Sequence, residues 1–168
     1  MTVLNREVRA IQNPALGSVL IWRSAALYRK CHSTASSMPL PLAFLILPIL
    51  FHEQTAELVA ATRIASGLNK LTEKFRSAEF SRTDLLLSVA SRANRMRTVT
   101  WEAIRLGLSA NLLLIDTGTA TLVSLTDTPH TAGVPATVRP LLNNAEKLGA
   151  WFAEMSMYEI SMQFQVSF

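Results

Sequence analysis

The sequence predicts an α+β fold that is mainly α-helical, with a helical core and one β-hairpin. Apolar residues recur at spacings of three and four over most of the chain, as they do in amphipathic helices. Near residues 112–125 this period gives way to two short apolar runs around Thr-Gly-Thr, as in a hairpin. At 168 residues the chain is long enough to bury roughly 70% of its unfolded surface. We therefore expect residues 1–168 to form a single domain.

The first predicted helix runs from Pro14 to about Lys30. Asn13 suits its N-cap, because the side-chain oxygen can accept a hydrogen bond from an unpaired backbone N–H. Pro14 suits the first helical position, where no backbone N–H is needed. The residues that follow, 34–39, are rich in Ser and Thr and are predicted to form a loop.

A wholly apolar run then extends over residues 40–51, with prolines just before it and within it. A transmembrane helix needs about 20 predominantly apolar residues, so this run is too short to cross a bilayer. We expect Pro41 to open a short helix and Pro48 to kink or end it, because the proline ring clashes with the carbonyl four residues back. The run should be buried on all sides, either in the domain core or against another protein.

Three helical segments are expected after this run. The first takes Thr55 as its N-cap and ends near Gly67, and the second continues at helical spacing over residues 68–75 as a short separate helix. The third starts with Ser81 as its cap. Asp84 lies three residues later, in a placement that resembles a capping box.

The helix that starts at Ser81 is predicted to break near Thr98, where β-branched residues cluster. A short helix over residues 101–106 would then end at Gly107, which fits a left-handed C-cap. The hairpin follows, and Gly118 is expected to supply the positive φ of its turn.

Three helices followed by a hairpin, within residues 56–125, are compatible with a winged-helix-like portion of the fold.

Pro140 is predicted to open the last helix. Beyond it, residues 162–168 alternate apolar and polar side chains, which suits an edge strand. An exposed edge of this kind can pair with a second chain. Phe164, Val166 and Phe168 are therefore candidates for a strand-pairing interface.

No motif indicates catalysis or a resident cofactor. Cys31 and His32 are adjacent, and neighbouring helical residues point about 100° apart, so they cannot readily form a nucleophile–base pair. The three histidines lack the spacing of zinc ligands, and no nucleotide-binding glycine motif occurs, so ATP hydrolysis would have to come from a partner. We predict no catalytic residue, no metal and no cofactor. A small hydrolase that uses Cys31 is the weakest of the alternatives.

Positive charge is concentrated in the middle of the chain. Residues 63–105 carry nine Lys/Arg and four Asp/Glu, a net +5, whereas residues 106–168 carry two and five, a net −3. Such a segment could face a phosphate backbone or an acidic protein, although a solvated helix face has the same composition. The candidate contact residues are Arg82, Arg92, Arg95 and Arg97.

The composition is apolar for a chain of this size. Charged residues are 17% of the sequence and the mean hydropathy is +0.26, whereas about 25% charged residues are usual in a soluble domain. Low charge without a membrane span is typical of a protein that hides surface in a complex, although a compact helical domain with a large core also fits. The single cysteine and the lack of a targeting segment predict a cytoplasmic location.

Several motifs carry a resemblance to a known bacterial family, the three-component ABC system middle components. The similarity extends from about Asn5 to Glu159. The motifs that carry it are Asn13-Pro14-Ala-Leu, Met38-Pro-Leu-Pro-Leu-Ala-Phe-Leu-Ile-Leu-Pro48, His52-Glu-Gln-Thr, Leu112-Leu-Leu-Ile-Asp-Thr-Gly118 and Lys147-Leu-Gly-Ala-Trp-Phe-Ala153. The tail after Tyr158 departs from the family's pattern, so the resemblance implies nothing about it.

The resemblance implies a small non-enzymatic adaptor subunit between an SMC/Rad50-like ABC ATPase and an effector protein. Such systems, of the Lamassu type, defend bacteria against phage and plasmids, and DNA would be contacted through the complex. The family supplies no catalytic residues to carry over. The alternative hypothesis is a stand-alone winged-helix DNA-binding protein, in which Arg92, Arg95 and Arg97 contact the duplex.

Overall fold

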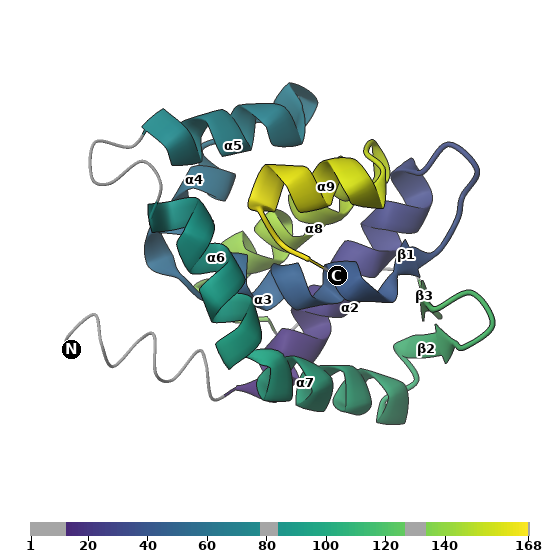
Figure 1. Cartoon of the computed structure of the whole chain (residues 1–168). Helices are drawn as coiled ribbons and strands as arrows, with labels where there is room; N and C mark the ends of the chain where they lie inside the picture. The colour runs from purple at the N-terminus through teal and green to yellow at the C-terminus, as the bar shows by residue number, and fades with distance from the viewer. Residues whose placement is uncertain (1–12, 78–83, 127–133, 168) are drawn as a thin grey trace.

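Helix α2 (Pro14–Cys31) lies at the centre of the molecule and is covered by helices on several sides (Figure 1). The structure, a computed structural model, describes residues 13–77, 84–126 and 134–167. Asn13 caps α2 as predicted, since its side chain accepts a hydrogen bond from the Leu16 backbone N–H at 3.0 Å. Arg29 and Lys30 complement the negative end of the helix dipole in the last turn.

The core is built around the packing of α2 against α8 (Arg139–Ala153), the most extensive contact between any two elements. Their backbones approach most closely at Gly149, where an added Cβ would lie 2.1 Å from the Ser24 carbonyl oxygen. The Ser24 hydroxyl donates to the Ala145 carbonyl at 2.8 Å, and Arg23 pairs with Glu146 at 2.6 Å. Pro140 opens α8, as predicted.

The apolar run forms three short elements: β1 (Met38–Pro39), the 3₁₀ helix η1 (Leu40–Leu42) and α3 (Ala43–Leu50). Its burial is confirmed for most side chains, which belong to one hydrophobic cluster with α2 and α8. Three residues of the run, Leu40, Pro41 and Phe44, are only half-buried. The run is therefore core on most of its surface and retains one accessible side.

Proline shapes the end of this run. Pro48 lies inside α3, which ends two residues later, and α4 (Glu53–Ala60) leaves at an angle of 102° to the segment before it. Among the described residues no single helix is long and apolar enough to cross a membrane. The bent pair formed by Leu40–Leu50 and Glu53–Ala60 meets that criterion only when the two helices are taken together.

Helix α4 begins earlier and ends sooner than expected. Its N-cap is His52, not Thr55, because the chain already turns at the end of α3. The Thr55 hydroxyl instead bonds to carbonyls of that turn. The helix ends at Ala60, not near Gly67. Gly67 has a φ of +71°, follows a single 3₁₀ turn, η2 (Ile64–Ser66), and starts α5 (Gly67–Ser77).

Helices α6 (Asp84–Arg95) and α7 (Arg97–Ser109) correct the next two expectations. The break between them falls at Met96 and not near Thr98, and α7 is longer than predicted. Gly107 lies inside α7 and not at a left-handed cap, and the positive φ after this helix belongs to Asn111, at +55°. Glycine is required at 107 for a different reason, since a Cβ there would come within 2.6 Å of Leu113 Cδ1. Ser81, the predicted cap of α6, lies outside the described residues.

The hairpin is confirmed as β2 (Leu113–Asp116) and β3 (Thr121–Ser124), although its turn differs in detail. The positive φ belongs to Ala120, at +52°, and not to Gly118, whose N–H bonds to the Asp116 carboxylate at 2.9 Å. Strand β1 pairs antiparallel with β3, which gives a sheet in the order β1-β3-β2. Because β1 lies outside residues 56–125, the sheet extends beyond the predicted winged-helix-like portion, which stays a prediction.

The edge strand predicted near the C-terminus is wrong for the described residues. Residues Met157–Phe164 form helix α9 instead, because Ser156 and Glu159 make a capping box that starts a helix. Phe164 is fully buried, and its ring meets those of Phe75 and Phe152 edge-on, with centroids 6.4 and 6.2 Å away. Val166 follows the helix in a non-helical tail, and Phe168 lies outside the described residues.

Candidate protein-docking surface

An open apolar groove lies between three parts of the chain that are distant in sequence. Its floor is η1 and α3, one wall is the junction of α6 and α7, and the other is the tail that follows α9. Figure 1 shows this tail running from α9 down towards α3. The cavity volume is about 550 Å³, which is within the range of ligand sites. The groove is lined by Leu40, Pro41, Phe44, Leu45, Ala90, Ala93, Asn94, Arg97, Trp101, Gln165, Val166 and Ser167.

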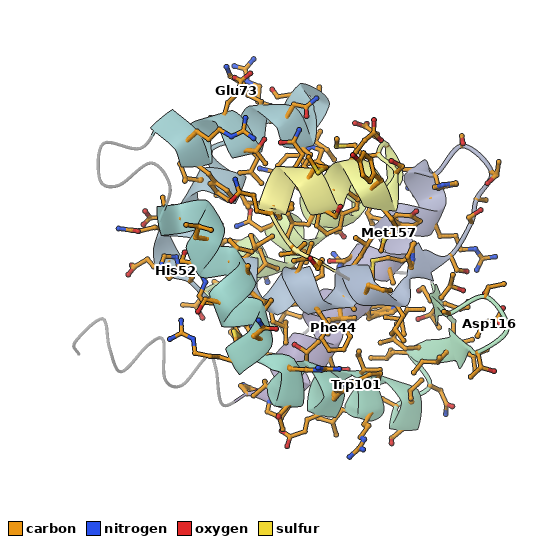
Figure 2. All side chains as sticks on the ribbon, in the orientation of Figure 1. Phe44, His52, Glu73, Trp101, Asp116 and Met157 are labelled. Atoms are coloured by element: carbon orange, nitrogen blue, oxygen red, sulfur yellow. The ribbon has the colours of Figure 1, made fainter. Side chains whose placement is uncertain are left out.

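Two aromatic rings join the floor to the wall. Phe44 of α3 and Trp101 of α7 pack edge to face, with ring centroids 5.2 Å apart and planes at 71° (Figure 2). Both side chains are half-buried, so each keeps part of its apolar surface accessible. Trp22 and Trp151, by contrast, are almost fully buried and donate their indole N–H groups to backbone carbonyls.

The predicted basic residues fall into different environments. Arg92 is half-buried, and it donates from Nε to the Pro48 carbonyl at 3.0 Å and from Nη1 to the Ser88 hydroxyl at 2.9 Å. It therefore ties α6 to the end of α3. Arg95 and Arg97 are exposed on either side of the break between α6 and α7, and Arg97 lines the groove. Arg82 lies outside the described residues, and a nucleic-acid contact by these arginines stays a prediction.

The outer face of α9 presents a second hollow beside the groove. Tyr158 and Met162 are 72% and 61% exposed, which is unusual for such large apolar side chains. Residues 165–167 of the tail line both hollows, so the two are contiguous around the tail. We call the groove together with the outer face of α9 the docking surface.

The inner face of α9 explains why these residues point outward. Ile160 and Phe164 are buried in the core. The Gln163 side-chain amide makes two hydrogen bonds to α5. Its oxygen accepts from the Thr72 hydroxyl at 2.8 Å, and its nitrogen donates to Asn69 Oδ1 at 2.7 Å. With one face fixed in this way, helical geometry turns the positions at 158 and 162 to the solvent.

Acidification is expected to weaken the start of α9. The Ser156 backbone N–H, and then its hydroxyl, hold the pKa of the exposed Glu159 carboxyl below its ordinary value of 4.5. A lowered folded-state pKa adds stability above the unfolded value, and that stability is lost as the pH falls through the folded-state pKa. Amide hydrogen exchange of α9 measured from pH 6 down to about pH 3 tests this. Glu159→Gln keeps a neutral capping partner, so exchange in α9 of this variant should depend less on pH than in the wild type. The same pH dependence in both proteins would contradict a role for the Glu159 carboxylate.

A separate apolar patch lies on the small sheet. Leu114 and Leu125 are 50% and 48% exposed. Leu114 lies opposite Val123 across the hairpin, and Leu125 follows Val123 by two residues just beyond β3, where its N–H still donates to the Leu112 carbonyl at 3.0 Å, so the three share the outer face. The sheet patch lies just after the C-terminal end of α7, and Arg97 of the groove lies at the N-terminal end of the same helix. At 1.5 Å per residue, α7 spans about 20 Å. The chain thus offers two apolar faces at the two ends of one helix.

The described residues considered for metal binding or catalysis do not lie together at one site. Among the described residues, no three His, Cys, Asp or Glu side chains gather in a way that could hold a metal ion. Cys31 is exposed, but the adjacent His32 stacks on Tyr28 at 5.3 Å and contacts Thr34. His52 serves as the cap of α4.

Sequence reasoning missed the main residues of this surface. Trp101 lies in an amphipathic sequence pattern, which is typical of a core residue, and Met162 starts the run that predicts an edge strand, with Tyr158 shortly before it. A local signal for α9 was present in Ser156 and Glu159, since Ser-x-x-Glu is the capping-box sequence. With that helix assigned, the spacing of four between Tyr158 and Met162 would have placed both on one face.

The comparisons with known proteins point to one family. A family model described as ABC-three component (ABC-3C) system Middle Component 3 matches residues 1–168, the whole chain. No curated protein and no solved structure matches.

Proposed function

The chain belongs to the Middle Component 3 family of ABC-three component systems, and from this premise we propose that it is a non-enzymatic adaptor subunit that links the ABC ATPase of its system to an effector protein. The family description places the chain among the other components of a three-component system. In our proposal the ATPase is SMC/Rad50-like and the system is a defence of the Lamassu type against phage and plasmids. DNA is contacted through the assembled complex.

The docking surface is the observation that carries this proposal. Large apolar side chains of α3 and α7 line the groove, and those of α9 line the adjoining hollow. A contiguous exposed apolar surface marks sites of protein interaction. The sheet patch supplies a second apolar face. A subunit that links two proteins needs two such faces, and the low charge of the whole chain agrees with surface hidden in a complex.

Co-expression of the chain with the ABC ATPase and the effector of its own system tests the proposal. We expect both to co-elute with the wild-type chain. Charges placed on the docking surface, Tyr158→Lys with Met162→Lys, should weaken one partner about tenfold or more, because an unpaired charge is costly in a desolvated interface. Leu114→Lys with Leu125→Lys should weaken the other partner by a similar factor.

Ile64→Lys is the matched control, because Ile64 is 50% exposed and belongs to neither surface. It should leave both partners bound. A chain that elutes alone as a stable monomer in the presence of both components contradicts the adaptor role. Loss of the same single partner in both double variants contradicts the assignment of two separate faces.

A further inference from the structure

We infer that the groove receives an amphipathic helix of a partner protein, whose apolar side chains contact Phe44 and Trp101 and whose carboxylate pairs with Arg97. This inference rests on the proposed adaptor function and specifies what one of the two partners must present. Three features of the groove lead to this inference: its apolar lining, the hydrogen-bonded backbone of its walls, and Arg97, which makes no ion pair with any described residue.

The floor calls for apolar anchors. Phe44 on the floor, Trp101 on one wall and Val166 on the other are each half-buried and line the same cavity, and α6 contributes only small alanine side chains and Asn94. Anchors at positions i, i+3 or i+4 and i+7 of a helix match a groove of this kind. Among the described residues that line the groove, Arg97 is the single basic side chain, whereas phosphate backbones are bound by several, so this lining favours an apolar partner over nucleic acid.

The walls favour a helix over an extended peptide. Three of the segments around the groove are α-helices, whose interior backbone groups are bonded within the helix. In the tail, the N–H groups of Gln165 and Val166 both donate to the Ser161 carbonyl. None of the described residues that line the groove belongs to a strand, so an extended peptide would find no strand edge among them, and burying its unpaired backbone groups would be costly. A helix satisfies its own backbone.

The charge selects an acidic partner. Of the described residues that line the groove, Arg97 alone is charged, and it makes no ion pair with any residue that the structure describes. The same described lining contains neither Asp nor Glu. A guanidinium binds a carboxylate through two parallel hydrogen bonds, and an apolar surround strengthens that pair relative to one in bulk water.

Peptides of about 20 residues that tile the ATPase and effector of the chain's own system serve as the probes, a length that spans roughly 30 Å when helical. Binding to the full chain is followed by fluorescence polarisation and by acrylamide quenching, which reports on Trp101 because the other two indoles are buried. We expect the binding peptides to be amphipathic and acidic. Arg97→Glu should weaken them about tenfold, and replacing the peptide's Glu or Asp by Lys should restore binding to that variant.

Arg105→Glu is the control, since Arg105 is exposed on the same helix but does not line the groove. It should change affinity by less than about threefold, as expected of a charge outside the contact. Peptide binding that is indifferent to Arg97→Glu overturns the inference, as does displacement of the peptide by duplex DNA. If no peptide binds while the intact components still co-elute, the inference fails and the adaptor function stands; if nothing co-elutes, the adaptor function itself fails.

Discussion

Replacing Gly149 with Ala is expected to destabilise the protein by about 3 kcal/mol or more, at the upper end of overpacking effects. The new Cβ would lie 2.1 Å from the carbonyl oxygen of Ser24 and 2.8 Å from its carbonyl carbon. These are backbone atoms in the middle of α2, so no side-chain rotation can relieve the clash, and α2 and α8 must move apart. In an unhindered helix the same change would be stabilising, because Ala is the better helix former.

Two other glycines calibrate this effect. In Gly107→Ala the new Cβ would lie 2.6 Å from Leu113 Cδ1. Because this atom is the end of a side chain that can move, we expect a smaller loss of stability, about 1 kcal/mol. Gly118→Ala lies on an exposed turn, and we expect a change within about 0.5 kcal/mol. Urea unfolding followed by far-UV circular dichroism measures the free energy of unfolding of all three variants. Their midpoints can be compared where the m-value is unchanged. Equal stabilities of the Gly149 and Gly118 variants would show that the helices can separate freely.

Replacing Phe164 with Ala is expected to cost about 3–5 kcal/mol, the range for deleting a buried phenylalanine. The ring is fully buried and packs edge-on against two other phenylalanines, Phe75 of α5 and Phe152 of α8. Its loss leaves a cavity between three helices and removes the main apolar anchor of α9. Hydrogen exchange in α9 should accelerate together with the loss of global stability.

Met162→Ala is the matched control in the same helix, because Met162 is 61% exposed and points to solvent. It should change the free energy of unfolding by no more than about 0.5 kcal/mol, as surface substitutions do. Comparing Phe164→Ala with Met162→Ala also tells whether Phe164 acts as a core residue or as part of an exposed interface. Were Phe164 part of an exposed interface, its replacement would leave the isolated chain stable and weaken only the binding of a partner.

The elements that could be predicted from sequence are those whose signals are local. Asn13 and Pro14 define the start of α2 within two positions, and Thr-Gly-Thr between two apolar runs defines the hairpin. Gly107 shows where such reasoning fails. A glycine near the end of a helical pattern indicates a cap, but here Leu113 occupies the space a Cβ would need, and that contact forms only when β2 folds back on α7.

The end of the chain shows two local signals in competition. Alternation over residues 162–168 favours a strand, whereas the capping box at Ser156 favours a helix. The helix forms because Ile160 and Phe164, four residues apart, reach the core on one face and Gln163 bonds to α5. That core is assembled from distant segments, so alternation alone could not reveal it.

The groove could not be predicted for a related reason. The apolar run looked uniformly buried, and nothing local distinguishes its half-exposed residues, such as Phe44, from their buried neighbours. The difference is made by α7 and the tail, which cover one side of the run incompletely. Of the three predicted contact arginines that the structure describes, Arg97 alone lines this site, and its presence in the same groove as Phe44 depends on tertiary structure.

The packing of α2 against α8 has a consequence for how the chain reaches its native state. The hydrogen bond from Ser24 to Ala145 joins residues 121 positions apart, within the largest contact of the molecule. Contacts of such long range slow folding, because a long loop must close before they form. During synthesis from the N-terminus, α2 emerges long before α8 exists. The side of α2 that faces α8 is therefore covered only after residues 139–153 have been made, whereas α3 and α7 can pack against α2 earlier.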